Sequence, residues 1–250
     1  MVSNKNIIDK SVKIGHGTKI GFNNIIFKDV EIGEDCQIGH NIVIYSGTKI
    51  GRKVRIDDNT VIGKLPMKAS ISAITKEKKL LPAVIGDECI IGTQVVIYAG
   101  CKISKNVLVA DLSSIREDVE IGEYTIIGRG VAVENKCFIG KRCKIETNAY
   151  ITALSEIEDF VFISPNVTFT NDNFMGRTKE RFKYHKGVTI KRGGRIGANA
   201  TVLPAITIFE DGLVAAGSIV TKDVPERKIV LGCPAKVWND VPKEQLLENQ

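Results

Sequence analysis

The chain has 250 residues, of which 43% are hydrophobic and 26% are charged, and its formal net charge is +6. This composition suits one domain with a large apolar core and a well-solvated surface. No run of 18 apolar residues occurs, and residues 1–10 are too polar for a signal peptide. We therefore expect a cytoplasmic protein that makes no use of a membrane.

Isoleucine or a close substitute recurs at every sixth position over residues 8–62, 85–169 and 190–220. A small residue commonly lies four positions after the aliphatic residue, and therefore two positions before the next one. Side chains two apart on a strand share a face, so both residues point inward. A period of six is unlike that of an amphipathic helix or a half-buried strand, and it is typical of a β-solenoid.

Five of the six cysteines occupy the small inward position of the repeat, where a thiol packs as a small hydrophobe. They are Cys36, Cys89, Cys101, Cys137 and Cys143. Only Cys233 lies outside the repeat. We therefore interpret the cysteines as structural and expect neither a metal site nor disulfides.

The residue before each aliphatic position points outward, and these residues sort into three faces. One face carries no charge and consists of Ile7, Ile25, Val43, Val61, Val96, Ser114, Ala132, Tyr150 and Thr168. The other two faces carry Lys, Arg and Glu. A soluble monomer rarely exposes such a bare column, so we expect this face to pack against a neighbouring subunit in a homotrimer.

Two insertions interrupt the repeat, at residues 68–84 and 175–189. Counting hexads places both at the same corner of the solenoid, five coils or about 24 Å apart. The first has a formal charge of +3 (Lys68, Lys76, Lys78 and Lys79 against Glu77), and the second, with Arg177 to Lys186, has +4. Long basic loops in a regular solenoid favour a phosphate-rich small ligand. Nucleic acid is disfavoured because no aromatic stacking surface accompanies the charge.

The turns between the two insertions are also rich in polar groups. They carry Tyr98, the Arg-Glu-Asp sequence at 116–118, the Glu-Asn-Lys sequence at 134–136, Thr152 and the Thr-Asn-Asp sequence at 170–172. Charged turns are common in any solenoid, so each of these residues has solvation as its simplest interpretation.

Specific motifs occupy residues 137–238. They are Ile-Glu-Thr-Asn at 145–148, Phe-Thr-Asn-Asp-Asn at 169–173, Val-Thr-Ile-Lys-Arg-Gly at 188–193, Ile-Gly-Ala-Asn-Ala at 196–200, Ala-Gly-Ser-Ile-Val-Thr-Lys-Asp-Val-Pro at 216–225 and Gly-Cys-Pro-Ala-Lys at 232–236. Through these residues the chain resembles the nucleotide-linked amino-sugar N-acyltransferases. These are trimeric hexapeptide-repeat enzymes that use acyl-CoA in surface-polysaccharide biosynthesis. Residues 1–136 match that family mainly through the repeat.

The resemblance implies an all-β fold, a left-handed parallel β-helix with three hexads per coil and about ten coils. We expect this domain to span residues 1–238, with insertions at 68–84 and 175–189. Residues 239–250 form a C-terminal tail, which we expect to hold a short helix entered at Pro242.

The resemblance also implies site residues. Asn171 matches a family residue that contacts the sugar beside the reacting amine. The acidic residue found one coil earlier in the family is Ala153 here, so Glu134, two coils back, is the candidate replacement. Asn148 matches a residue that faces the active site from the adjacent corner, and His185 in the second insertion can approach that site.

The implied co-substrate is acetyl-CoA or another short-chain acyl-CoA, without a metal. Its pantetheine arm would lie near Ala198 and Ala216, and its phosphates near Lys191, Arg192, Lys222 and Arg227. The implied acceptor is a dTDP- or UDP-linked amino sugar. A neutral amine attacks a thioester readily, so positioning can supply much of the acceleration.

Three alternatives remain open, and a fourth is disfavoured. The chain could be an O-acetyltransferase or an acyl-carrier-protein-dependent acyltransferase, whose hydroxyl acceptors generally require a catalytic His. It could also be a non-catalytic solenoid scaffold. A γ-class carbonic anhydrase needs three His around a metal, whereas His16 and His40 fall on different corners and His185 lies in a loop.

Overall fold

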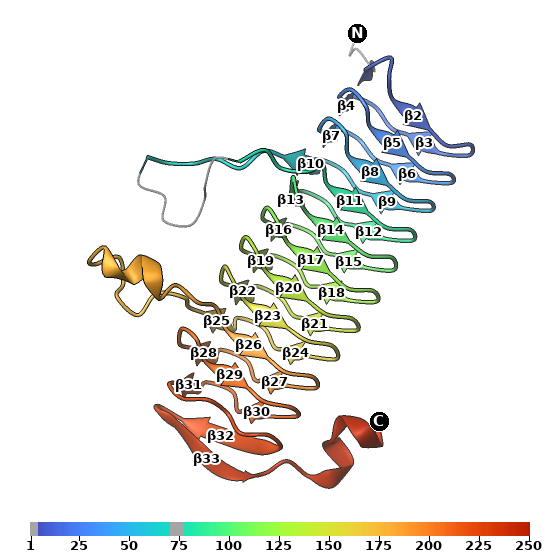
Figure 1. Ribbon diagram of the computed structural model, residues 1–250. Helices are drawn as coiled ribbons and strands as arrows, with labels where there is room; N and C mark the ends of the chain where they lie inside the picture. The colour runs from blue at the N-terminus through green and yellow to red at the C-terminus, as the bar shows by residue number, and fades with distance from the viewer. Residues whose placement is uncertain (1–4, 71–77) are drawn as a thin grey trace.

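The computed structural model describes residues 5–70 and 78–250, which form a rod of short parallel strands wound into coils (Figure 1). Every third strand in the chain joins the same sheet, so each coil contributes one strand to each of three sheets. In the uninterrupted coils, paired residues lie 18 positions apart, as Ile7 and Ile25 do. Three hexads per coil are therefore confirmed, and the fold class is the predicted all-β parallel solenoid.

We call the three sheets A, B and C. Sheet A consists of β1 (Ile7–Ile8), β4 (Ile25–Ile26), β7 (Val43–Ile44), β10 (Val61–Lys64), β13 (Val96–Tyr98), β16 (Ser114–Ile115), β19 (Ala132–Val133), β22 (Tyr150–Ile151), β25 (Thr168–Phe169), β28 (Thr201–Val202) and β31 (Ile219–Val220). Its outward residues are the uncharged column predicted from the sequence, which continues to Thr201 and Ile219.

Sheet B consists of β2 (Lys13–Ile14), β5 (Glu31–Ile32), β8 (Lys49–Ile50), β11 (Val84–Ile85), β14 (Lys102–Ile103), β17 (Glu120–Ile121), β20 (Phe138–Ile139), β23 (Glu156–Ile157), β26 (Thr189–Ile190) and β29 (Thr207–Ile208). Sheet C consists of β3 (Lys19–Ile20), β6 (Gln37–Ile38), β9 (Arg55–Ile56), β12 (Ile90–Ile91), β15 (Leu108–Val109), β18 (Ile126–Ile127), β21 (Lys144–Ile145), β24 (Phe162–Ile163), β27 (Arg195–Ile196), β30 (Leu213–Val214), β32 (Lys228–Gly232) and β33 (Ala235–Asp240).

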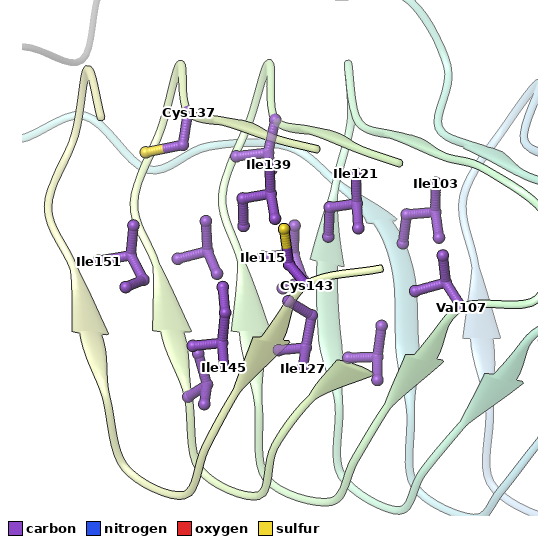
Figure 2. Packing of buried hydrophobic residues seen from close by; sticks show 14 of the residues in the cluster. Ile103, Val107, Ile115, Ile121, Ile127, Cys137, Ile139, Cys143, Ile145 and Ile151 are labelled. Carbon is purple, nitrogen blue, oxygen red and sulfur yellow. The ribbon is translucent and has the colours of Figure 1, made fainter. Parts of the chain in front are cut away.

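The core is a stack of the aliphatic repeat residues (Figure 2). Ile115, Ile127 and Ile139 are fully buried, and Phe169 is the largest of the fully buried side chains. The five repeat cysteines are buried as predicted, and Cys233 is exposed. Burial raises the pKa of the Cys101 and Cys137 thiols to about 12, so both remain protonated at neutral pH.

Most turns use a left-handed residue three positions after the aliphatic residue. Asn23, Asn106 and Asn199, for example, have φ near +60°. Asn tolerates this region better than most residues because its short polar side chain can form local hydrogen bonds. Repeating turns of one shape keep the strands in register from coil to coil.

The C-terminal end differs from the prediction. Sheet C has twelve strands and sheets A and B have eleven and ten, so there are slightly more coils than the predicted ten or so. The extra strands arise because β32 pairs with β30 and then turns back into antiparallel β33, which extends past the predicted boundary at 238. In place of the short helix predicted after Pro242, the structure has two separate three-residue 3₁₀ turns, η2 (Lys243–Gln245) and η3 (Leu247–Asn249).

Both insertions leave the rod between sheet A and sheet B, which confirms their predicted common corner (Figure 1). The first lies between β10 and β11, and the second lies between β25 and β26 and contains the 3₁₀ turn η1 (Glu180–Lys183). Five steps of sheet A separate β10 from β25. Lys76 and Glu77 lie outside the described residues, and within the rest of the chain no helix is long and apolar enough to cross a membrane.

Candidate active site

The turns that join sheet A to sheet B form what we call the A–B corner. Between the two insertions, the first and second residues of these turns stack from coil to coil. The first positions are Tyr98, Arg116, Glu134, Thr152 and Thr170, and the second positions are Ala99, Glu117, Asn135, Ala153 and Asn171. The polar strip between two basic insertions is the candidate active site.

Arg116 and Glu117 form the centre of this strip. Arg116 Nε donates to Glu117 Oε2 at 2.9 Å and Nη2 donates to Oε1 at 3.2 Å, while Nη1 reaches Glu134 Oε2 at 3.4 Å. Glu117 also accepts a 3.2 Å hydrogen bond from Asn135 Nδ2. The Glu117 side chain is 5% exposed, and these partners satisfy its buried carboxyl oxygens. This network therefore holds the Arg116 guanidinium in one orientation.

Tyr98, one coil before Arg116, packs against the Arg116–Glu117 network. The Arg116 guanidinium lies 5.0 Å from the centroid of the Tyr98 ring, and Lys64 Nζ lies 5.3 Å from the same centroid. Tyr98 is buried. Two cations thus lie against one aromatic ring, and Lys64 is the one that is not part of the Arg116–Glu117–Glu134 network.

Glu134 is the most distinctive ionisable group at the corner. Burial raises the pKa of its carboxyl group, Arg116 opposes that rise, and the neighbouring Glu117 adds to it. Tyr150 of β22 points outward close to Glu134. Burial of Tyr150 is the main cause that raises the pKa of its hydroxyl, and the charge of Glu134 adds to the rise. A half-buried carboxylate whose pKa is raised is a stronger base than an exposed one, which is a useful property in a general base.

Asn171 lies one coil after Ala153. The Asn171 Nδ2 donates a 3.5 Å hydrogen bond to the carbonyl oxygen of Ala153. Asn171 lies two coils, or about 10 Å, from Glu134 along the strip. Both predicted residues thus lie in the same strip at the A–B corner. Ala153 occupies the second turn position of the coil between them.

His185 lies near the end of the second insertion and belongs to a cluster around Asp172, which lies just before that insertion begins. Its Nε2 lies 3.5 Å from Asp172 Oδ2, which also accepts a 2.8 Å hydrogen bond from Arg181 Nη1. Burial acts to raise the pKa of the Asp172 carboxyl, but the N–H groups of Gly176 and Phe174 and the Arg181 guanidinium hold it well below its usual range. Asp172 is therefore an ionised anchor that orients His185 beside the strip.

Asn148 lies at a different corner, between sheets C and A. It occupies the left-handed turn position, with φ of 60°, and its N–H donates to Arg129 O at 2.9 Å. Within one protomer the structure does not bring it to the polar strip. Its direct role here is to shape a turn.

The residues predicted to bind CoA lie at three different corners. Lys191 and Arg192 follow sheet B, and Arg227 lies at the same corner, since its N–H donates to Glu210 O. Ala198 and Ala216 follow sheet C, and Lys222 follows sheet A. Lys191 pairs with Glu158 at 2.8 Å and Arg227 with Glu248 at 3.1 Å. One protomer therefore does not assemble these residues into a single site.

Arg116 and Glu117 were not among the predicted site residues. The sequence did show them in a charged triplet of an A–B turn, but a charged turn is usually only solvated. What distinguishes them is burial, which depends on neighbouring coils. Among the described residues no group of three or more His, Cys, Asp or Glu side chains could hold a metal ion.

Comparison with known proteins identifies the repeat. The family described as bacterial transferase hexapeptide (six repeats) matches residues 29–64. The serine acetyltransferase of Buchnera aphidicola is 34% identical over 85 residues, which cover 34% of this chain and 31% of the relative. The galactoside O-acetyltransferase of Lactococcus lactis is 35% identical over 80 residues, covering 31% of this chain and 39% of the relative. The chain thus spans well under half the length of these curated relatives.

Solved structures share the fold along nearly the whole chain. The UDP-N-acetylglucosamine acyltransferase of Arabidopsis matches with a TM-score of 0.63 and 18% identity, covering 100% of this chain and 77% of the other. The corresponding enzyme of Bacteroides fragilis matches with a TM-score of 0.58 and 20% identity, covering 96% and 75%. At these identities the similarity shows the fold, and this chain carries the hexapeptide repeat of the bacterial transferases on it.

Proposed function

We propose that this protein is an acyl-CoA-dependent N-acyltransferase that transfers an acetyl or short-chain acyl group to the amine of a dTDP- or UDP-linked amino sugar. The observation that carries this proposal is the half-buried Glu134 in the Arg116 network, located between two basic insertions. The two basic insertions provide an anion-binding surface, and the carboxylate of raised pKa between them provides a proton acceptor.

In the proposed reaction the sugar amine attacks the thioester carbonyl carbon. A C–N bond forms, the C–S bond breaks with its electron pair leaving on sulfur, and the amine proton passes to Glu134 and then to the thiolate. Asn171 and backbone N–H groups are the proposed donors to the developing oxyanion. Glu134 needs only a moderate basicity, because an amine is already a good nucleophile toward a thioester.

The acceptor class is supported by charge and by the comparisons. Lys64 and Arg116 at the strip, together with Arg177 and Lys179 in the second insertion, favour a ligand with phosphate groups. Solved proteins of the same fold are UDP-N-acetylglucosamine acyltransferases, and curated relatives are acetyltransferases. Together these observations favour acyl transfer to a nucleotide-linked sugar.

We further propose that the active form is a cytoplasmic homotrimer in which the uncharged face of sheet A is covered. The three groups of predicted CoA-binding residues lie at three corners of one protomer, so one extended ligand can contact them all only if neighbouring protomers share it. Analytical ultracentrifugation at micromolar concentration tests this, and a purely monomeric species would contradict it.

The activity is tested by incubating the protein with dTDP- and UDP-amino sugars and a series of short-chain acyl-CoAs. Thiol release and the mass of the sugar product are followed together. We expect release only when an amine acceptor is present, with a product heavier by one acyl group. Absence of acyl transfer to every amine acceptor would contradict the proposal and favour a scaffold function.

A second candidate is O-acylation, favoured by the His185–Asp172 pair. A hydroxyl needs a stronger base than an amine does, and a His held by an ionised carboxylate is the usual arrangement. In that case a hydroxyl sugar would accept the acyl group, and His185→Gln would abolish turnover. If the amine is the acceptor, we expect the same variant to retain most of its activity.

A further inference from the structure

A second feature lies on the outer face of sheet C, at the last coils and away from the A–B corner. Arg195 of β27 points outward between Phe162 of β24 and Leu213 of β30. Residues 241–250, the part of the C-terminal tail that follows β33, fold back over it, and Arg195 Nη1 donates to Gln245 Oε1 at 3.1 Å. Arg195 Nε and Nη2 are also buried, but they have no hydrogen-bond partner among the described residues.

The two unpartnered atoms have a specific geometry. Nε and Nη2 lie on one edge of the guanidinium plane, where their N–H bonds are parallel and match the two oxygens of a carboxylate. Leaving such donors buried and unpaired is costly, so the site is built for a partner that the chain itself does not supply.

Arg195 lines a cleft of about 260 Å³ between the tail and the solenoid. The cleft is several times larger than the volume of about 30 Å³ that one water molecule occupies in the liquid. Phe160, Phe162, Asp211 and Glu244 also line it. The wall therefore combines a carboxylate-binding edge, apolar rings and two acidic groups.

We propose that this cleft binds a small zwitterion of the α-amino-acid class. Its carboxylate would accept two hydrogen bonds from the Arg195 edge, and its ammonium group would lie toward Asp211 and Glu244. The same two acidic groups disfavour a doubly charged anion such as phosphate through like-charge repulsion. This inference does not rest on the proposed acyl transfer, because none of the residues that line the cleft is among those proposed to bind the sugar or CoA.

Binding would also hold the tail against sheet C. Arg195 contacts the tail through Gln245, and Asp211 Oδ1 accepts a 3.1 Å hydrogen bond from the Leu247 N–H. A ligand that joins Arg195 to Asp211 and Glu244 therefore stabilises the docked tail, and we expect it to raise the thermal midpoint of unfolding.

The test is isothermal titration calorimetry of the full chain with the standard α-amino acids, with short monocarboxylates and with inorganic phosphate. We expect at least one amino acid to bind with a Kd below about 1 mM. Arg195→Gln, and Arg195→Lys, which keeps the charge but loses the two-donor edge, should each weaken binding by about tenfold or more. Glu244→Gln should weaken amino-acid binding and leave monocarboxylate binding unchanged or tighter.

Arg55→Gln is the matched control. Arg55 is also an outward arginine of sheet C, but it is exposed and paired with Asp57, so its loss should not change the Kd. Circular dichroism verifies that each variant is folded. If Arg195→Gln does not fold, the binding measured with Arg195→Lys decides the test. Failure of every amino acid to bind, unchanged binding in the Arg195 variant, or binding of phosphate alone would overturn the proposal.

Discussion

The corner between sheets A and B and the corner between sheets B and C are made by the same six-residue repeat, yet their charges are arranged differently. At the B–C corner, charged residues form exposed pairs, such as Arg52 with Asp87 at 3.2 Å and Lys105 with Glu123 at 4.0 Å. At the A–B corner, Arg116 and Glu117 are largely buried and linked to Glu134 and Tyr98.

This difference is not required by the fold. Both corners use turns with a left-handed residue at the same position, as at Asn106 and Asp118, and both connect equally short strands. Exposed pairs contribute little to stability, whereas a buried charge network carries a desolvation penalty. Of these two corners, only the A–B corner, which lies between the two insertions, has such a buried charge network in the described part of the chain. The desolvation penalty there is not needed for the fold, and this indicates a function at the A–B corner.

The largest expected effect is on turnover. Glu134→Gln keeps the shape of the side chain but removes the proton acceptor, so we expect kcat/KM for acyl transfer to fall by about 100-fold or more. Glu123→Gln, at the B–C corner, should leave kcat/KM within about twofold. Both are measured by thiol release with the same amino sugar. Equal losses in the two variants would show that the two corners do not differ in function.

The second effect is on stability. Arg116→Gln leaves Glu117 buried beside a partner without charge, so we expect the free energy of unfolding to fall by about 3 kcal/mol. Arg52→Gln removes a side chain that is 67% exposed, and we expect a loss below about 1 kcal/mol. Urea denaturation of both variants measures the difference. A loss at Arg116 as small as that at Arg52 would mean that the network is effectively solvated.

Much of this comparison could be predicted from the sequence. The period of six placed five of the six cysteines in the core, identified the uncharged face of sheet A and put both insertions at one corner, because strand alternation and coil length are local properties. Glu134 and Asn171 were named through the family resemblance, and hexad counting placed both at that corner.

The burial of the Arg116 network could not be predicted in the same way. Whether a charged turn is exposed depends on the size of side chains one coil away, such as Tyr98 and Asn135, and on contacts 18 residues apart. The hairpin β32–β33 was missed for a related reason. Its residues lack the six-residue period, so only their pairing with β30 reveals them as strands.

The third effect concerns the predicted sugar contact. Asn171→Ala removes one uncharged hydrogen-bonding group at the end of the strip, and we expect kcat/KM to fall by about tenfold. Asn106→Ala, in a turn of the B–C corner, is the control for loss of an amide and should leave kcat/KM unchanged. Sedimentation should show the same oligomeric state for wild type and Asn171→Ala. An unchanged kcat/KM with the true acceptor would remove Asn171 from the site.

The smallest effect is on the pH dependence of stability. The pKa of Glu134 is raised in the folded protein, chiefly by burial, so folding favours its protonated form. Any contribution of this group to stability is therefore fully present below the carboxyl pKa of the unfolded chain and is lost as the pH rises through the folded pKa. Glu134→Gln cannot ionise, so its stability should decline less than that of the wild type over this window. Glu123→Gln should follow the wild type in urea titrations across the same pH range. If Glu134→Gln also follows the wild type, the Glu134 carboxylate is as well solvated as the carboxylates of the B–C corner, and the electrostatic contrast between the corners disappears.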